Sequence, residues 1–395
     1  MISADEARRL ATEGLVPLDA ETVPLHEALH RAAARDIAAT RPLPGFHNSA
    51  MDGYAVRHAD LAGDAPRLPI GMKISAGDAA DRQLPPGTVA RIFTGAPLPQ
   101  GADTVIMQED AETDGHEVVF RNVPPLASHV RYAGEDIAVG EPVVARGQTL
   151  HAGRIAMLAA QGHPEVSVYR RPRVAIVPNG DELVPIGDAV GFGQVPNTNS
   201  PMLAAQVRNA GGEPWPFAPV RDDLAAITEA MREAAAGADL VLTTGGMSVG
   251  DFDHARDALR ADGELSFYKV AVKPGKPLGL GRLEGTPILG LPGNPVSTFV
   301  GFELFGRPMV RTIGGFTVTD RPAFQAVLQR SVPQNRTRPE YVRCDILPDG
   351  TLQPWPKQGS SIISSLLHSD ALAKIPMGEG TIEAGTLVEA IDLRR

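Results

Sequence analysis

The stretch "TPILGLPGNPVSTFVGFELFG" (residues 286–306) decides the fold. It reads as a short apolar strand, a glycine and proline turn, and a helix that begins near Asn294. Pro295 suits the first position of that helix, and Gly293 lets the backbone turn sharply before it. A buried strand that passes through a tight turn into a helix is the repeating unit of parallel α/β sheets.

The chain around this stretch continues the alternation of strand and helix from residue 171 to 315. "PRVAIVP" (172–178) and "ADLVLTTGG" (238–246) predict apolar strands, and "NSPMLAAQVRNAGG" (199–212) and "DDLAAITEAMREAAAG" (222–237) predict helices. Such alternation favours parallel strands with helices on both faces. We therefore expect residues 171–315 to form a three-layer α/β domain with a mostly parallel sheet.

The flanking regions have different patterns and predict three further domains. Strong helix formers fill much of residues 1–41, which open with a capping box from Ser3 to Glu6, and they return in "HAGRIAMLAAQG" within residues 135–170. These two regions predict one discontinuous helical linker domain. Residues 42–134 are rich in Pro, Gly and short strand patterns, which predicts an inserted β-rich domain. Short strand patterns over residues 316–395 predict a C-terminal β domain.

Composition limits the kinds of partner. The net charge of −10 over 395 residues argues against a nucleic-acid or membrane surface, because both need a basic field. No apolar run approaches the ~18 residues of a membrane span, and the charged start is unlike a signal peptide. The single cysteine, Cys344, excludes an internal disulfide and suits a reducing compartment, either as an inert buried residue or as a reactive thiol. We expect a cytoplasmic protein that binds neither nucleic acid nor membrane.

A glycine-containing loop, Thr243 to Gly246, follows the predicted strand residues Leu240 to Leu242. At Gly245 and Gly246 the missing side chains let backbone N–H groups approach an anion. Ser248 adds a donor, and Asp251 and Asp253 add groups that can hold a metal or move a proton. The alternative is that the glycines only form a turn.

The turn "LPGNPVS" repeats this logic at the end of a second strand. A helix N-terminus carries unpaired N–H donors and about half a positive charge, so a phosphate fits there. Asn294 can cap that helix, and Ser297 lies in its first turn. Taken alone, the stretch is equally a well-made helix start.

The lysines are concentrated in one place. The chain has six, and three of them lie in "KVAVKPGK" (269–276). The alternation predicts a strand in which Lys269 and Lys273 share one face, about 13 Å apart at ~3.3 Å per residue, with Lys276 in the following turn. An anion site accounts for this cluster, and an edge strand guarded by lysines is the alternative.

Acidic residues also occur in turns. Glu182 follows the strand 172–178, which places it at the same sheet edge as the glycine turn if the strands are parallel. Asp222 either reaches that edge or, like Asp223, is an acidic residue favoured at a helix N-terminus. Asp52 and Asp136 lie outside the α/β domain, and the sequence alone does not bring them to it.

The combination of motifs resembles the molybdopterin molybdenumtransferases, the family that includes the gephyrin C-terminal domain. The stretches that carry the resemblance run through the chain: "NSAMDGYAV", "RIFTGAPLPQGADTVIMQED", "VRYAGEDI", "GDELV", "PNTNSPML", "TTGGMSVGDFDH", "KPGKPLGLG", "LPGNPVS" and, more weakly, "GSSIISSL". The family pattern often has Asp where this chain has His47, and the C-terminal domain matches least well.

The resemblance implies an elongated homodimer of four-domain subunits whose third domain has the fold of the molybdopterin adenylyltransferases. It also implies that the second domain of one subunit closes on the third domain of the other, so that Asp52 joins Glu182 and Asp253. The implied reaction takes adenylylated molybdopterin and molybdate and yields molybdenum cofactor and AMP, with Mg²⁺ present.

The resemblance implies the roles of the residues that follow. The substrates carry several negative charges, which lysines, backbone N–H groups and Mg²⁺ have to offset. The expected catalytic residues are Asp52, Thr94, Asp136, Glu182, Asp253, Lys269 and Lys273. The residues expected to bind the pterin phosphate and nucleotide are Arg131, Thr244, Gly245, Gly246, Ser248, Lys276, Pro292, Gly293, Asn294, Pro295 and Ser297. The expected Mg²⁺ ligands are Asp222 and Asp253.

Two other functions share parts of this pattern. A molybdopterin adenylyltransferase would have the same glycine and "LPGNP" turns, but such enzymes lack the long N-terminal region with "NSAMDGYA" and "GED". A non-enzymatic scaffold like gephyrin would not need the acidic residues and the three clustered lysines that this chain retains. Contact with a separate molybdopterin adenylyltransferase is a further expectation.

Overall fold

The computed structural model describes residues 1–79, 81–246 and 254–394, and it divides into two compact units. The large unit contains residues 1–35, 146–155 and 164–395, and the small unit contains residues 36–145 and 156–163.

A six-stranded sheet forms the centre of the large unit, with strand order β16-β13-β17-β20-β19-β18. The first four strands are parallel to one another, and β19 runs antiparallel to both β20 and β18. The sheet is therefore mostly parallel, as the strand and helix alternation predicts. The bounds are β13 (Arg173–Pro178), β16 (Glu213–Pro216), β17 (Leu240–Thr244), β18 (Glu264–Tyr268), β19 (Gly279–Leu283) and β20 (Thr286–Leu291).

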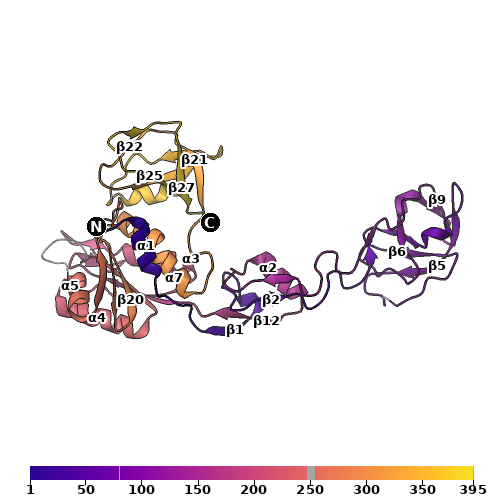
Figure 1. Cartoon of the computed structure of the whole chain (residues 1–395), viewed down its shortest axis with the longest axis horizontal. Helices are drawn as coiled ribbons and strands as arrows, with labels where there is room; N and C mark the ends of the chain where they lie inside the picture. Colours follow the sequence, from indigo (N-terminus) through magenta and orange to yellow (C-terminus); the bar gives the residue numbers. More distant parts are fainter. Residues whose placement is uncertain (80, 247–253, 395) are drawn as a thin grey trace. The chain divides into compact units, whose positions relative to one another are not determined.

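Helices cover both faces of this sheet (Figure 1). Ile176 and Leu242 face the cluster that contains α1 and α3, whereas the neighbouring residues Val177 and Val241 face α4 and α5. This alternation along buried strands produces the expected three layers. No helix in the described part of the chain is both long and apolar enough to cross a membrane. The bounds are α1 (Ala4–Thr12), α3 (Asn199–Ala210), α4 (Leu224–Gly237) and α5 (His254–Asp262).

One uninterrupted helical stretch follows β20. It consists of α6 (Pro295–Gly301), a π-helical turn η4 (Phe302–Gly306) and α7 (Arg307–Ile313). Pro308 has no backbone N–H, and its ring would crowd the carbonyl of Leu304 in a regular helix. The wider π turn before the proline makes room for the ring and lets the helix continue.

A second sheet forms the C-terminal part of the large unit, with strand order β21-β27-β25-β23-β24 and antiparallel neighbours throughout. It confirms the predicted C-terminal β domain. Its elements are β21 (Ala323–Val327), β22 (Val332–Pro333), β23 (Glu340–Ile346), β24 (Leu352–Pro354), η5 (Ile363–His368), β25 (Ala371–Ile375), β26 (Thr381–Ile382) and β27 (Leu387–Asp392).

The helical interpretation of residues 1–41 is wrong beyond α1. Ser3 caps α1 by accepting a hydrogen bond from the Glu6 N–H, as the capping box predicts. The chain then forms β1 (Ala20–Pro24) and the 3-10 turn η1 (Leu25–Glu27), and β1 pairs with β12 (Glu165–Tyr169). The segment "RAAA" (31–34) is not helical either. Ala32 forms a β-bridge to Thr149, and Ala33 forms one to Val168. Sheet pairing here overrides the helix propensity of alanine. The second predicted helix exists as α2 (Ala152–Ala160).

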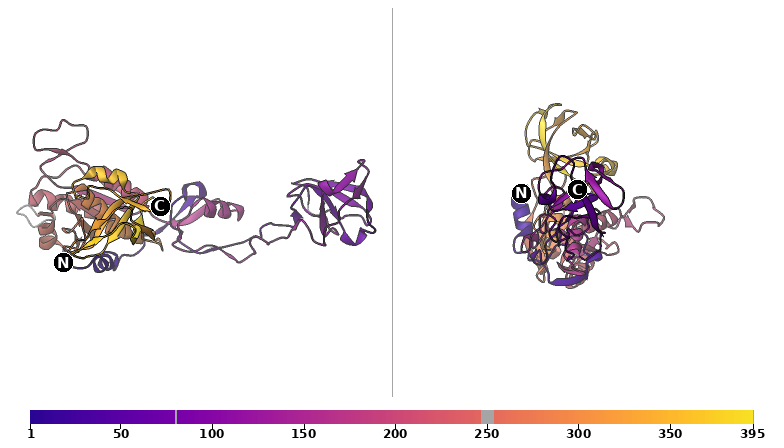
Figure 2. Two further views of the ribbon diagram at one scale, coloured as in Figure 1. Left: turned by 90° about the horizontal axis from the view of Figure 1, so that it is seen from above. Right: turned by 90° about the vertical axis from the view of Figure 1, so that its right-hand side faces the viewer.

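The small unit is built on a six-stranded sheet with order β7-β4-β6-β5-β9-β8 (Figures 1 and 2). All its strand pairs are antiparallel except β5 with β6, and apolar clusters pack on it around Ile92 and around Phe120. The predicted inserted β-rich fold is therefore present. Its elements are β2 (Ile37–Ala38), β3 (Asn48–Ser49), β4 (Gly53–Val56), η2 (His58–Asp60), β5 (Arg67–Ile74), β6 (Val89–Ile92), β7 (Thr104–Met107), η3 (Gln108–Asp110), β8 (Ala111–Thr113), β9 (Glu117–Phe120), β10 (Val130–Arg131) and β11 (Pro142–Val144).

Candidate functional site

The carboxyl ends of three parallel strands meet at one edge of the large sheet. Pro178, Thr244 and Leu291 are in register across β13, β17 and β20. The backbone continues this pairing by one step, because the Asn179 N–H donates to the Thr244 carbonyl and the Gly245 N–H donates to the Leu291 carbonyl. Three loops therefore begin along one line, where open α/β sheets bind ligands.

Glycine is required where two of these loops approach each other. Gly245 has a φ of +92°, and a Cβ there would lie 2.5 Å from the Asn179 carbonyl oxygen. A Cβ on Gly293 would lie 3.8 Å from the Cα of Gly245. The glycines thus allow a turn and a close approach of the two backbones. The missing side chains also let a ligand such as an anion or a pterin approach the backbone.

A cavity of about 620 Å³ opens between these loops. It is also bordered by β14 (Leu183–Val184), β15 (Val195–Pro196) and the C-terminal segment at Ser361. Its volume is that of a small-molecule site. Six of the predicted site residues line it: Glu182, Gly245, Gly246, Gly293, Asn294 and Pro295.

Buried amides at this edge have polar atoms that the described residues do not satisfy. Both side-chain polar atoms of Asn179 lack a described hydrogen-bond partner, as does Oδ1 of Asn199. The Asn199 Nδ2 donates to the Gly293 carbonyl at 2.8 Å, which fixes the amide at the cavity wall. Orphaned amide groups beside a cavity are suited to a ligand with hydrogen-bonding edges, as a pterin has.

The start of α6 differs in detail from the expectation. Asn294 occupies the N-cap position and Pro295 is at the helix start, but the Asn294 side chain makes no capping hydrogen bond. Its Nδ2 donates instead to the Ser360 Oγ at 3.3 Å, and the Val296 N–H donates to the Ser360 carbonyl. The C-terminal segment thus takes the role expected of the cap, because it lies directly against the helix N-terminus.

Three predicted binding residues lie behind the cavity wall. Thr244 is buried in β17, and Pro292 and Ser297 are buried around the start of α6. The Pro292 carbonyl accepts a hydrogen bond from the Thr298 hydroxyl, which stabilises the turn. We find none of the three in the lining of the cavity, so their contribution to the site is the placement of their neighbours.

The predicted strand through the lysines is wrong. β18 ends at Tyr268, and Lys269 has a φ of +77°, a left-handed conformation that no regular strand contains. Val270 and Val272 are buried and the lysines beside them are half-buried, so the alternation of faces survives without the strand. The apolar pattern was therefore informative about burial but not about backbone conformation.

The three lysines have different surroundings. The Lys269 Nζ lies 4.8 Å from the centre of the Tyr268 ring. The Lys273 Nζ forms an ion pair of 2.9 Å with Glu340, whose side chain is only 6% exposed. Lys276 is exposed, and the adjoining Gly275 lies beside the first turn of α6, near the Ser297 carbonyl. Lys276 is therefore the lysine best placed to meet an anion from solution, although none of the three lines the cavity.

The acidic residues at this edge form a partial cluster. The Asp222 carboxylate accepts from the Asp181 N–H at 3.4 Å, and the Asp181 carboxylate accepts from the Asp222 N–H at 3.1 Å. This pairing brings Asp222 next to the loop that carries Glu182. Asp223, rather than Asp222, caps α4 by accepting from the Ala226 N–H.

No group of three or more His, Cys, Asp or Glu side chains in the described part of the chain is arranged to hold a metal. Three predicted residues, Ser248, Asp251 and Asp253, lie outside the described residues.

The small unit brings together a second group of predicted residues. The Asp52 Oδ1 accepts from both the backbone N–H and the hydroxyl of Thr94, each at 2.8 Å. The Thr94 backbone bond is the main cause that lowers the pKa of Asp52, followed by the Thr94 hydroxyl, and the charge of Arg91 adds to both. Asp52 is exposed, so it presents a stable carboxylate to solvent.

Arg131 and Asp136 belong to a neighbouring loop of the small unit. Arg131 in β10 pairs with Asn48 in β3, four residues before Asp52. Both Arg131 and Asp136 are exposed. The His47 Nδ1 accepts from the Ala133 N–H at 2.9 Å, so it supplies the acceptor that an Asp at this position would also supply.

The lone cysteine is inert in the folded protein. Cys344 is fully buried in the C-terminal sheet, and burial raises its pKa to about 12. The thiolate that would react is therefore suppressed. This excludes the reactive alternative.

Sequence reasoning missed several residues at and around the cavity of the large unit. Asn197 and Asn199 line the cavity, and Asn179 is buried beside Gly245, but all three read as ordinary turn and helix-start residues. Ser360 and Ser361 reach it from a distant part of the chain. The signal for Asn197 and Asn199 was the "PNTNSPML" motif, which carried the resemblance without a stated role.

Models of three protein regions match the chain: the MoeA N-terminal region (domain I and II) at residues 2–162, a probable molybdopterin binding domain at 175–312, and the MoeA C-terminal region (domain IV) at 325–393. Together with the fold and the cavity, they define a multidomain α/β protein of the molybdopterin-binding class. The molybdopterin molybdenumtransferase 2 of Mycobacterium tuberculosis is 37% identical, with 100% of each chain covered. A molybdopterin molybdenumtransferase of Nostoc is 37% identical over 95% of this chain and 89% of its own. The chain belongs to the molybdopterin molybdenumtransferase family.

The solved structures support the same assignment. The molybdopterin biosynthesis MoeA protein of Pyrococcus horikoshii OT3 has a TM-score of 0.87 and 30% identity, with 99% of this chain and 100% of that chain covered. The predicted family and multidomain fold are confirmed. Since the similarity includes the N-terminal and C-terminal regions as well as the molybdopterin-binding domain, a stand-alone adenylyltransferase is not favoured.

Proposed function

We propose that this enzyme inserts molybdenum from molybdate into adenylylated molybdopterin and releases AMP. The family assignment supports molybdenum insertion in cofactor synthesis as the reaction class. The observation that carries the finer proposal is the cavity of about 620 Å³ at the carboxyl edge of the sheet. Glycine turns, orphaned amides and a helix N-terminus meet there, which suits a pterin joined to phosphate groups.

The chain's residues would hold the two ends of such a substrate differently. The unsatisfied Oδ1 of Asn199, a residue of the cavity wall, offers a hydrogen-bond acceptor to the pterin edge. The close backbone turn at Gly246 and the positive end of the α6 helix dipole would face phosphate charge. Lys276 adds a mobile cation near the same turn. The step that releases AMP is the attack of a water oxygen on one phosphorus of the pyrophosphate linkage: a P–O bond to water forms, the bridging P–O bond breaks, and AMP leaves.

A magnesium ion fits the donors at this edge in part. Mg²⁺ takes oxygen ligands and usually keeps several waters, so one or two carboxylates are enough. Asp222, whose carboxylate accepts from the Asp181 N–H next to Glu182, and Asp253 are the proposed ligands. The ion would neutralise phosphate charge and polarise the bond that breaks. Glu182, at the cavity wall, is left to orient the substrate.

The group around Asp52 completes the site under the same proposal. The Asp52 carboxylate fixed by Thr94, with Asp136 nearby in the chain, is suited to hold a metal-bound water, and Arg131 supplies a positive charge for an anion. We propose that the small unit of one subunit closes on the large unit of its partner in a homodimer. Contact with a molybdopterin adenylyltransferase, which would hand over the substrate, and a cytoplasmic location remain predictions.

The test is a reaction with defined substrates. Purified protein is mixed with adenylylated molybdopterin, Mg²⁺ and molybdate, and AMP and metal-bound pterin are both measured. We expect both products to form. Turnover of ATP with free molybdopterin, without turnover of the adenylylated form, would identify an adenylyltransferase instead. Turnover of neither substrate set would leave the scaffold as the remaining function.

A further inference from the structure

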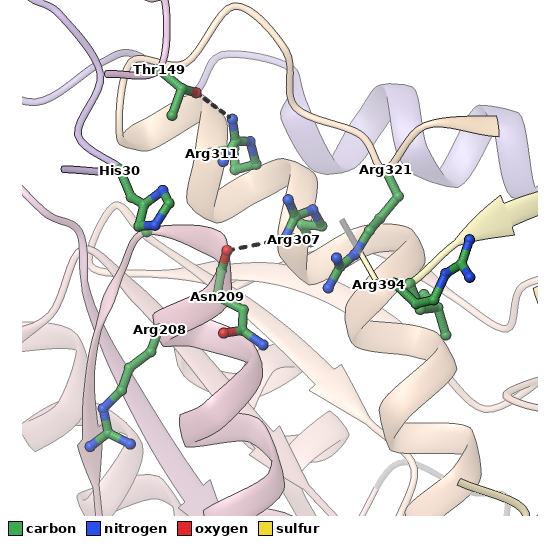
Figure 3. A pocket seen from close by; sticks show the side chains of 10 residues that line it. His30, Thr149, Arg208, Asn209, Arg307, Arg311, Arg321 and Arg394 are labelled. Atoms are coloured by element: carbon green, nitrogen blue, oxygen red, sulfur yellow. Dashed lines mark hydrogen bonds between the residues drawn. The ribbon is translucent and has the colours of Figure 1, made fainter. Parts of the chain in front are cut away.

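A second cavity, of about 380 Å³, lies in the large unit away from the candidate site (Figure 3). Among the described residues that line it there is no carboxylate. Five arginines line it: Arg208, Arg307, Arg311, Arg321 and Arg394. Asn209, at the end of α3, lines it, whereas Asn199, at the start of α3, lines the candidate site. Ten residues of helix separate the two positions by about 15 Å.

The arginines converge although their charges repel. Arg307 and Arg321 both line the cavity, and the Arg307 guanidinium is directed toward the Asn209 carbonyl in Figure 3. Burial, followed by the charge of Arg321, lowers the pKa of Arg307 to about 10. Burial, followed by the charges of Arg307 and Arg321, lowers the pKa of Arg311 to about 10. Both side chains stay charged at neutral pH, so an energetic cost of charge crowding is built into this cavity.

The neighbouring acids compensate only part of this charge. Glu303 pairs with Arg321 at 2.9 Å, and Asp392 pairs with Arg394. Arg311 donates to the Val318 carbonyl and to the Thr149 hydroxyl. Neither Arg307 nor Arg311 forms an ion pair with a carboxylate in the described part of the chain.

Arg307 is a buried arginine whose hydrogen-bonding capacity is only partly used. Only 7% of its surface is exposed, and its Nε has no hydrogen-bond partner among the described residues. Its Nη1 donates to the Asn209 carbonyl at 3.3 Å, so capping of α3 uses one of its five N–H donors. Helix capping alone does not explain why a buried guanidinium faces a cavity with its Nε unsatisfied.

We propose that this arginine pocket binds a small phosphorylated molecule at a site separate from the candidate active site. Guanidinium groups bind phosphate oxygens through paired hydrogen bonds, and several arginines match a polyanion better than one ion. The pocket is lined by residues of α3 and α7, by Thr149, which precedes α2, and by Leu393, which follows β27. A bound polyanion would hold these segments together and stabilise the folded large unit.

The test uses inorganic pyrophosphate as the probe with the full-length protein. Pyrophosphate is expected to raise the Tm of the wild type and to bind in calorimetry. R307M is expected to weaken this binding by about tenfold or more, because it removes a charged donor of similar length. Without pyrophosphate, R307M should melt no lower than the wild type, because it removes a crowded buried charge. A lower Tm of R307M without the probe, together with unchanged binding, would make Arg307 purely structural and overturn the proposal.

Three further variants keep the test decisive. R208Q changes an exposed arginine at the pocket and should also weaken binding, even if R307M fails to fold. R260Q, at an exposed arginine of α5 on the other face of the sheet, is the matched control and should bind like the wild type. K276Q separates this pocket from the candidate site and should keep pyrophosphate binding. Loss of binding in K276Q with full binding in R208Q and R307M would place the phosphate site elsewhere.

Two other probes define the ligand. AMP tests for a nucleotide and citrate tests for a carboxylate, each in the K276Q background. Binding of pyrophosphate or AMP that depends on Arg307 supports a phosphorylated ligand. A higher affinity for citrate than for either pyrophosphate or AMP would overturn the assignment of a phosphorylated ligand.

Discussion

Asp52 and Thr94 are the most clearly organised pair of the candidate residues. Two donors of one threonine meet one carboxylate oxygen, and the pKa of Asp52 falls below its ordinary value of 3.8 as a result. Because the folded pKa is below the unfolded one, this arrangement stabilises the protein above the ordinary pKa and is lost as the pH falls through the lowered value. Asp52 is thus ionised throughout the neutral range.

T94V removes the hydroxyl donor and keeps the backbone donor. We therefore expect the pKa of Asp52 to rise toward its ordinary value without reaching it, measured by NMR titration of the carboxyl carbon. T113V, at an exposed threonine of the same unit, is the control and should leave the pKa of Asp52 unchanged. An Asp52 pKa in T94V that equals that of the wild type would show that the hydroxyl does not act on the carboxylate.

At the scale of elements, the glycine turn after β17 is the part most sensitive to a single methyl group. Gly245 combines a left-handed φ with a carbonyl that would lie 2.5 Å from a new Cβ, whereas Gly285 has a similar φ of +85° and open space around it. G285A should cost about 1 kcal/mol of unfolding free energy from the backbone conformation alone.

G245A should cost at least about 1 kcal/mol more than G285A, because the backbone of the neighbouring loop has to move. Thermal and denaturant unfolding measure the difference. Equal losses in the two variants would mean that the two loops at the sheet edge separate easily and that glycine is needed there only for its φ.

The same elements show what a sequence predicts and what it does not. The strands and helices over 171–315 were predictable because buried strands and capped helices leave local patterns, and the cavity edge followed from parallel topology. The segment at 31–34 was mispredicted because Ala32 and Ala33 form bridges to Thr149 and Val168, which are distant in the sequence. Lys273 was placed among the catalytic residues, and its pairing with Glu340 depends on a contact between residues 67 positions apart. Such long-range contacts leave no local pattern.

At the scale of the large unit, Lys273 and Glu340 join the α/β domain to the C-terminal sheet. The Lys273 N–H donates to the Pro339 carbonyl, and the Tyr341 N–H donates to the Lys273 carbonyl, so backbone and side chain both connect the two parts. The carboxylate of Glu340 is almost completely buried and would lose its ion-pair partner without the lysine.

A double-mutant cycle with K273A, E340A and both together measures this connection. We expect a coupling of about 1 kcal/mol or more in unfolding free energy. We also expect K273A to reduce turnover by more than about tenfold with the fold intact, as the anion role requires. Zero coupling would contradict the structural role of the pair, and unchanged turnover in K273A would remove Lys273 from the catalytic group.

The proposed homodimer makes a prediction for mixed subunits. D52N and K276Q change different units, so a dimer with one subunit of each kind contains one site without either substitution. Random mixing should then restore about a quarter of the wild-type sites, because half the dimers are mixed and half their sites are intact. Activity is measured after co-refolding or co-expression. Mixtures no more active than the separate variants would contradict a site shared between subunits.

The most direct test of the central claim is the ratio of products in a single turnover. Enzyme in excess over adenylylated molybdopterin is supplied with Mg²⁺, with or without molybdate, and AMP and molybdenum-bound pterin are quantified in the same sample. We predict one AMP for each molybdenum-bound pterin, with both products reduced in K276Q and unchanged in K357Q, the control at an exposed lysine. AMP release without molybdenum-bound pterin in the presence of molybdate would contradict molybdenum insertion by this enzyme.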